Sequence, residues 1–203
     1  MNGAGATGER AGRAERTTRE SDVRVWVNLD QATPPEVSTG LGFFNHMLDA
    51  MATHGGIGLR VEAAGDLEVD AHHVVEDTGI VIGRALRDAL GDMDGIERFG
   101  DALVPLDEAL AQVAVDVCGR PYLAWSGDWP PFPAGGLFPD LWPEFFRGLA
   151  RGAGLTIHVR LLAAANAHHA AEAAFKAAGR ALGTATRRDA RRSQLSTKGA
   201  IDR

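Results

Sequence analysis

The sequence of 203 residues contains a single cysteine and no apolar run near the roughly twenty residues that a membrane span requires. One thiol cannot form a disulfide within the chain, which excludes a disulfide framework and a four-cysteine zinc site. Cys118 ends an apolar run typical of a strand, so we expect it to be buried. The first residues lack the apolar segment of a secretory signal, and we therefore expect a cytoplasmic protein.

Positive charge is also scarce. The chain has 21 Lys and Arg residues against 27 Asp and Glu residues, which gives a formal net charge of -6. Proteins that bind nucleic acid usually carry a basic patch, so we expect neither a nucleic-acid partner nor a membrane partner. The hydrophobic content of 45% is enough for a globular core.

The motif His-His-x-x-Glu occurs twice, as His72, His73 and Glu76 and again as His168, His169 and Glu172. Four of the seven histidines lie in these two copies. Residues four apart share one face of a helix, so the first histidine and the glutamate of each copy form a pair able to bind one metal ion. The second histidine of each copy points about 100° away.

The similarity between the two copies extends upstream. Gly56–Val61 precedes the first motif as Gly154–Val159 precedes the second, and by position Glu144 corresponds to His46. We therefore expect an α/β fold of the α+β type with internally duplicated half-domains. Each half-domain should be a small mixed sheet with two helices packed on one face.

The composition predicts four segments within one catalytic domain. Residues 1–16 lack apolar anchors and are expected to form a flexible N-terminal extension without chemistry. Residues 17–97 and 98–187 are the two half-repeats, and residues 188–203 form a flexible basic C-terminal tail.

Periodicity predicts the elements inside these halves. We expect helices from about Leu41, from His72, through Glu144 and from His168 to about Thr186. The expected strands cover residues 23–29, 57–63, 67–70, 102–106, 110–118, 122–126 and 155–162. The turn at residues 118–121 favours an antiparallel hairpin between two of them.

Two repeats that face each other could assemble two metal sites, each with a His/Glu pair from one helix and an adjacent histidine from the opposite helix. The fourth ligand would come from a preceding helix. The first set is His46, His73, His168 and Glu172, and the second set is His72, Glu76, Glu144 and His169. Imidazole and carboxylate ligands without thiolates suit manganese, iron or zinc better than calcium, and manganese is our first choice.

With these residues assembled, the chain resembles the imidazoleglycerol-phosphate dehydratase family of histidine biosynthesis from about residue 16 to residue 199. The segments that carry the resemblance include both His-His motifs, Phe44–Asp49, Arg98–Gly100, Pro105–Leu110, Gly119–Leu123 and Phe175–Ala177. The resemblance implies a lyase that dehydrates D-erythro-imidazole-glycerol phosphate to imidazole-acetol phosphate through a metal-stabilised imidazolate. It also implies two Mn²⁺ ions per active site and a homo-oligomer of twenty-four subunits with active sites between subunits.

The resemblance further assigns residues to the phosphorylated substrate. These are Glu20, Arg98, Arg120, Lys176, Ser196, Thr197 and Lys198, whose cations and hydroxyls mostly serve the phosphate. Glu20 is our first candidate for the acid-base residue, and Glu76 or Glu172 is the alternative if either leaves its metal during turnover.

Three residues depart from the family pattern. Glu144 stands where the family usually has a histidine ligand, and Asn45 and Ala71 replace aspartates beside His46 and His72. A catalytically impaired paralogue that serves as a metal-bound structural or binding assembly is therefore the alternative hypothesis. A dinuclear metallohydrolase also fits the ligand types, but it leaves the duplicated upstream segments unexplained.

Overall fold

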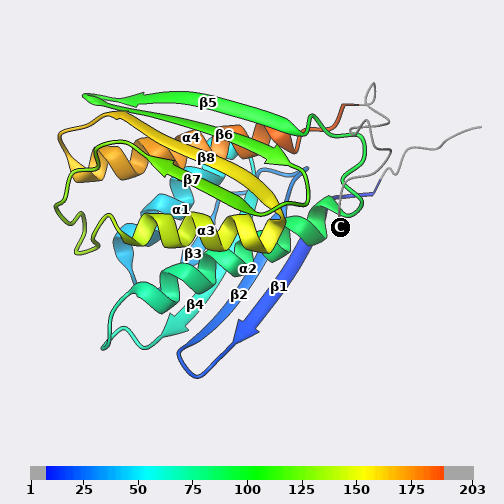
Figure 1. Ribbon diagram of the computed structural model, residues 1–203. Coiled ribbons are helices and arrows are strands. Elements are labelled where there is room, and N and C mark those ends of the chain that lie inside the picture. The colour runs from blue at the N-terminus through cyan, green and yellow to red at the C-terminus, as the bar shows by residue number, and fades with distance from the viewer. Residues whose placement is uncertain (1–7, 190–203) are drawn as a thin grey trace, which may run out of the picture.

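The computed structural model describes residues 8–189, which form four helices and two sheets of four strands each. Figure 1 shows the helices packed between the two sheets. No helix in this part of the chain combines the length and apolar character needed to span a membrane. The first half contains β1 (Ala11–Thr17), β2 (Ser21–Asn28), β3 (Glu36–Ser38), α1 (Gly42–Gly55), β4 (Gly58–Gly65) and α2 (His72–Leu90). The second half contains β5 (Phe99–Leu106), β6 (Ala109–Val117), β7 (Tyr122–Ser126), α3 (Leu141–Ala153), β8 (Leu155–Ala163) and α4 (Ala167–Ala185).

The two sheets repeat one topology. The first has the strand order β1-β2-β4-β3 and the second the order β5-β6-β8-β7. In each sheet two pairs are antiparallel, and the last pair, β3 with β4 or β7 with β8, is parallel. The predicted duplication and fold class are therefore confirmed.

Glycines let the helices of the two halves pack with their backbones in contact. A Cβ atom on Gly83 of α2 would lie 2.5 Å from the Leu149 carbonyl oxygen of α3, and one on Gly179 of α4 would lie 2.0 Å from the Met51 carbonyl oxygen of α1. Further contacts along both pairs advance in the same direction, so the helices in each pair run parallel. The first helix of each half thus packs on the second helix of the other half.

The core fills the space between the sheets and the helices. The side chains of Phe44, Phe145, Phe146 and Phe175 are fully buried, and Phe145 contacts both Phe44 and Phe175 with ring centroids 5.5 and 5.1 Å apart. These rings come from α1, α3 and α4, so the aromatic core joins the two halves into one unit. Cys118 is buried and free, as expected.

Three sequence-based expectations are wrong. Residues 11–16 are not a flexible extension, because Ala11–Thr17 pairs with β2 along its whole length. Residues 67–70 form a turn rather than a strand. The strand at residues 122–126 pairs in parallel with β8 and not with β6, so the predicted hairpin at residues 118–121 does not form. The hairpin of this half joins β5 to β6 instead.

Substitution of Gly83 by Ala tests the helix contact. The added methyl would lie 2.5 Å from the Leu149 carbonyl oxygen and 2.8 Å from the Ala153 backbone nitrogen, so α2 and α3 must separate. We expect a loss of about 2 kcal/mol in the free energy of unfolding, although Ala is otherwise the better helix former. Thermal unfolding at fixed protein concentration measures it. Gly42→Ala is the control, because no atom lies within 4 Å of its added Cβ; equal melting temperatures for the two variants would contradict the account.

Candidate metal centre

Three predicted ligands meet where α1 packs on α4. The Glu172 carboxylate lies 3.0 Å from His168 Nε2 and 3.5 Å from His46 Nε2. His168 and Glu172 are one turn apart on α4, as the motif spacing requires, and His46 comes from α1 of the other half. The His168 ring is also held by Phe43, which contacts it edge-on with ring centroids 4.9 Å apart. We call His46, His168 and Glu172 the His46 cluster.

The geometry of this cluster fits one divalent cation. Ligand atoms bound to a common ion at about 2.0 to 2.3 Å lie roughly 3 to 4.5 Å from one another. One ligand atom from each member of the His46 cluster lies within 4.8 Å of the other two. Small side-chain rotations would therefore bring all three into bonding distance of a metal.

Lys176 lies one turn beyond Glu172 and pairs with its second carboxylate oxygen at 2.7 Å. Burial alone would raise the pKa of Glu172, but the Lys176 ammonium and the hydrogen bond with His168 outweigh it, and the net shift is downward. Glu172 is therefore an anion near neutral pH. Lys176, predicted to bind substrate, lies directly beside the metal ligands.

The pseudo-symmetric second set is less closely gathered. His72 Nε2 lies 3.7 Å from Glu76, but Glu144 forms an ion pair with Arg147 on its own helix. A Cβ on Gly148, one turn beyond Glu144, would lie 2.7 Å from the Glu76 carbonyl oxygen. Glu144 thus lies level with the first turn of α2, where His46 lies relative to α4, but its carboxylate points to Arg147.

The second histidine of each motif does not join the set predicted for it within this chain. His73 Nδ1 lies 3.1 Å from both oxygens of Asp66, and its Nε2 lies 3.8 Å from Glu20. His169 Nδ1 lies 2.8 Å from Glu108. The hydrogen bond with Asp66 raises the pKa of His73, and the hydrogen bond with His169 lowers the pKa of Glu108 to about 2.

Asp66 and Glu108, the carboxylates hydrogen-bonded to these two histidines, were not predicted as site residues. A sequence signal was present for Glu108, which stands in the family-like segment Pro105–Leu110. No spacing rule linked either acid to His73 or His169. Asp107, beside Glu108, also approaches His169, with its carboxylate 3.9 Å from Nε2. Contacts between a hairpin turn and a helix start depend on the tertiary fold.

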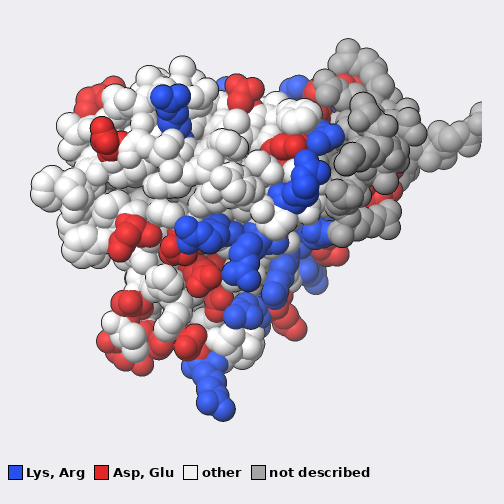
Figure 2. Space-filling model, viewed as in Figure 1, with Lys and Arg blue, Asp and Glu red and all other residues white. Residues whose placement is uncertain are grey.

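A hollow of about 300 Å³ adjoins the second set. Glu20, His73 and Glu76 share it with Arg16, Asp77, Ile80, Arg84, Arg151 and Gly152. Figure 2 shows basic side chains gathered over α2, α3 and β1 with acidic side chains next to them. Arg16 pairs with Asp77 at 2.9 Å, and Arg151 approaches Glu76 at 3.9 Å. Glu20, the candidate acid-base residue, and its alternative Glu76 therefore line the same hollow.

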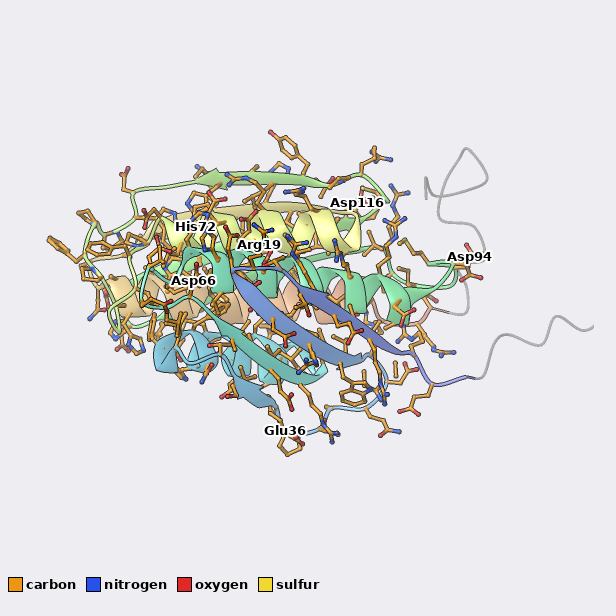
Figure 3. The ribbon with its side chains drawn as sticks, turned by 90° about the horizontal axis from the view of Figure 1, so that it is seen from below. Arg19, Glu36, Asp66, His72, Asp94 and Asp116 are labelled. Carbon is orange, nitrogen blue, oxygen red and sulfur yellow. The ribbon has the colours of Figure 1, made fainter. Side chains whose placement is uncertain are left out.

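Arg98 and Arg120 lie at the other end of the molecule. Both approach Asp116, at 2.7 and 3.9 Å, and the Arg98 backbone N–H donates to the carbonyl of Ala185 at the end of α4. Figure 3 shows Asp116 well separated from His72 and Asp66. From His168 to Ala185, α4 rises about 25 Å at roughly 1.5 Å per residue. One chain therefore does not bring these arginines to its own His46 cluster.

Other predicted residues lie outside the described part of the chain or away from the His46 cluster. Ser196, Thr197 and Lys198 lie outside the described residues, as does most of the predicted tail. The Asn45 side chain accepts hydrogen bonds from the Thr39 backbone and hydroxyl, at 3.0 and 2.6 Å. It is therefore engaged away from the metal ligands.

A model of the imidazoleglycerol-phosphate dehydratase family matches residues 39–182. The chain belongs to this family. A relative described as imidazoleglycerol-phosphate dehydratase in Desulfitobacterium hafniense is 51% identical over 188 residues, covering 92% of this chain and 96% of its own. One from Symbiobacterium thermophilum is 51% identical over 201 residues, covering 98% and 97%.

Solved structures of imidazoleglycerol-phosphate dehydratases have the same fold. The Pyrococcus furiosus enzyme in complex with (S)-C348 superposes with a TM-score of 0.81 at 40% identity, covering 92% of this chain and 99% of its own. The Staphylococcus aureus enzyme gives a TM-score of 0.79 at 39% identity, covering 88% and 99%. The family predicted from the sequence motifs is confirmed.

The ion pair between Lys176 and Glu172 leads to a prediction for the protein without added metal. The two side chains are only 19% and 14% exposed, so Lys176→Met leaves a largely buried carboxylate without its cation. We expect a loss of about 1–3 kcal/mol at pH 7. Because the folded pKa of Glu172 lies below its ordinary 4.5, the stabilisation is complete above that value and is lost as the pH falls through the folded pKa.

Unfolding of wild type and Lys176→Met at a series of pH values measures this difference. Arg180→Met, an exposed change one turn further along α4, is the matched control and should be nearly neutral. A difference between wild type and Lys176→Met that grew as the pH fell below 4.5 would contradict the assignment.

Proposed function

We propose that this chain dehydrates D-erythro-imidazole-glycerol phosphate to imidazole-acetol phosphate in histidine biosynthesis, with divalent cations as cofactors. Membership of the dehydratase family supports the reaction, and the His46 cluster supports the cofactor. The proposal depends most on that cluster, because the two halves of the chain supply imidazole and carboxylate donors at distances that suit one ion. Manganese remains our first choice of metal, and a cytoplasmic location remains a prediction.

The proposed ligand sets are His46, His73, His168 and Glu172 for one cation and His72, Glu76, Glu144 and His169 for the other. In a single chain His73 and His169 turn toward Asp66 and Glu108. We therefore propose that each set is completed by a histidine from another copy of the chain. Closed homo-oligomers, including the expected twenty-four-subunit assembly, can repeat such a contact around symmetry axes.

The short length of the substrate also supports a site shared between copies of the chain. The substrate is one ring and a three-carbon chain, far shorter than the roughly 25 Å along α4 between His168 and the Arg98 end. A site that uses both ends must therefore combine different copies. Arg98 and Arg120 would bind the phosphate by charge-assisted hydrogen bonds, and Lys176 would bind it from beside the His46 cluster.

The reaction needs a weakly acidic carbon proton to be removed. When bound, the cations supply Lewis acidity at the nitrogens of the substrate ring. Glu20 lies in the turn between β1 and β2, is about half exposed and approaches His73, so it can reach a substrate in the hollow that it lines. We assign it the acid-base role, with Glu76 and Glu172 as the alternatives.

Substitution of Glu144 tests whether the chain binds both cations. We expect two manganese ions per chain in the wild type by elemental analysis, and Glu144→Ala should weaken one of them at least about tenfold. Glu144→His should keep both and raise turnover, because a neutral ligand leaves the metal a stronger Lewis acid. Arg147→Ala, which frees the Glu144 carboxylate, is the control and should retain both ions.

One observation favours a second candidate function, the impaired paralogue. The Glu144 carboxylate is engaged by Arg147 and not by the His72 pair. Metal-loaded wild-type protein that fails to dehydrate the substrate, together with activity in Glu144→His, would establish it. Release of inorganic phosphate from the substrate would instead indicate a metallohydrolase.

Mixed assemblies test whether the active sites are shared between copies. His168→Ala removes a proposed metal ligand and Arg98→Ala a proposed phosphate ligand, so each variant alone should be inactive. Co-expressed with different tags and purified as mixed assemblies, they should recover about one quarter of wild-type activity, since each of two contributing copies is intact half of the time. Inactivity of well-assembled mixtures would place both residues of a site in one chain.

A further inference from the structure

His73 and His169 share a feature that distinguishes them from the other proposed ligands. Each has a carboxylate against Nδ1, from Asp66 at 3.1 Å and from Glu108 at 2.8 Å. For His46, His72 and His168, the carboxylate contacts among residues 8–189 run through Nε2 to a fellow ligand of the same set. His73 and His169 lie away from the other members of their ligand sets within one chain. They are also the two histidines whose Nδ1 contacts a carboxylate outside those sets.

The chemistry of imidazole gives this difference a consequence. A neutral ring carries one N–H, and only the other nitrogen has a lone pair for a metal. A carboxylate can only accept, so it selects the tautomer with hydrogen on Nδ1 and leaves Nε2 as the donor atom. It also fixes the rotation of the ring, which matters most for a ligand with no other member of its set nearby in the same chain.

We infer that Asp66 and Glu108 are positioning residues that hold His73 and His169 as Nε2 donors for cations shared with another copy of the chain. The inference rests on the proposed ligand sets above. The two carboxylates lie outside the proposed cation sites. They would hold each imidazole ring in its metal-binding orientation before the copies of the chain assemble.

The Glu108 carboxylate and the backbone that carries Asp66 are each held by further hydrogen bonds. One oxygen of Glu108 accepts from the backbone N–H of Asn166 at 2.9 Å and of Ala165 at 3.4 Å, which leaves the other oxygen for His169. The Asp66 backbone N–H donates to the Glu20 carbonyl at 3.0 Å, which fixes the turn that follows β4. Both acids thus connect a strand end to the first turn of a metal-bearing helix.

Glu108→Gln isolates the role in the tautomer. The amide oxygen of Gln can keep the two backbone hydrogen bonds, while its NH₂ group then faces His169 Nδ1 and donates to it. That reverses the tautomer and places the hydrogen on Nε2. We expect the affinity for one of the two Mn²⁺ ions to fall about 10- to 100-fold, with the melting temperature of the metal-free protein nearly unchanged.

The measurement is a Mn²⁺ competition titration of the full-length protein, repeated with Co²⁺, whose visible absorption reports imidazole coordination. Asp66→Asn should weaken the other Mn²⁺ site in the same way. Asp101→Asn, an exposed change on the neighbouring strand β5, is the matched control and should alter neither titration nor spectrum.

His169→Ala separates failure of this inference from failure of the proposed function. If His169→Ala loses one Mn²⁺ while Glu108→Gln binds both with wild-type affinity and spectrum, the positioning role is wrong and the ligand set stands. If His169→Ala also binds both ions normally, the ligand set is wrong and the inference fails with it. A lower melting temperature in Glu108→Gln with unchanged Mn²⁺ affinity would make Glu108 a purely structural residue and overturn the proposal.

Discussion

Parallel helices from opposite halves of the chain pack with their backbones in direct contact, and this packing positions both sheets and the four helix-borne histidines of the two motifs and their partners. Gly83 against Leu149 and Gly179 against Met51 allow α2 to lie on α3 and α4 to lie on α1 without side chains between them. Because each pair joins the first helix of one half to the second helix of the other, neither half could supply either proposed ligand set alone. The duplicated fold and the proposed metal sites therefore depend on the same packing of helices.

The same contact explains why only three members of the first proposed ligand set meet within one chain. It places the N-terminal turns of α1 beside the N-terminal turns of α4, which brings His46 to His168 and Glu172. The adjacent histidine on each helix, about 100° further round, necessarily leaves that cluster and reaches a carboxylate of a neighbouring turn. A chain with one complete group of three and two outward histidines is suited to an assembly that pairs copies.

Much of this was predictable from the sequence because the signals were local. The four helices followed from apolar periodicity, and the alignment of the two motifs predicted that Glu144 corresponds to His46. β1 was missed because its inward positions include Gly12 and Ala14 rather than large apolar residues. Gly12 is required there, since a Cβ would lie 2.1 Å from the Ala85 carbonyl oxygen of α2. Because close packing on α2 leaves room only for small residues, β1 lacks the alternation of large apolar residues by which strands are predicted from sequence.

Other features were set by contacts between distant residues. The parallel pairing of β7 with β8 is not encoded in either strand, so the turn at residues 118–121 predicted the wrong partner. Spacing could not show that Arg98 lies at the end of α4 opposite His168, nor that Glu108 reaches His169. These positions depend on how the two halves meet.

Crystallography of the assembled protein with Mn²⁺, using anomalous scattering at the manganese edge, would show whether two copies share a cation. We predict a manganese peak within bonding distance of His46, His168 and Glu172 of one copy and of His73 of another. A peak bound entirely by one chain, or no manganese at the His46 cluster in fully loaded protein, would contradict it.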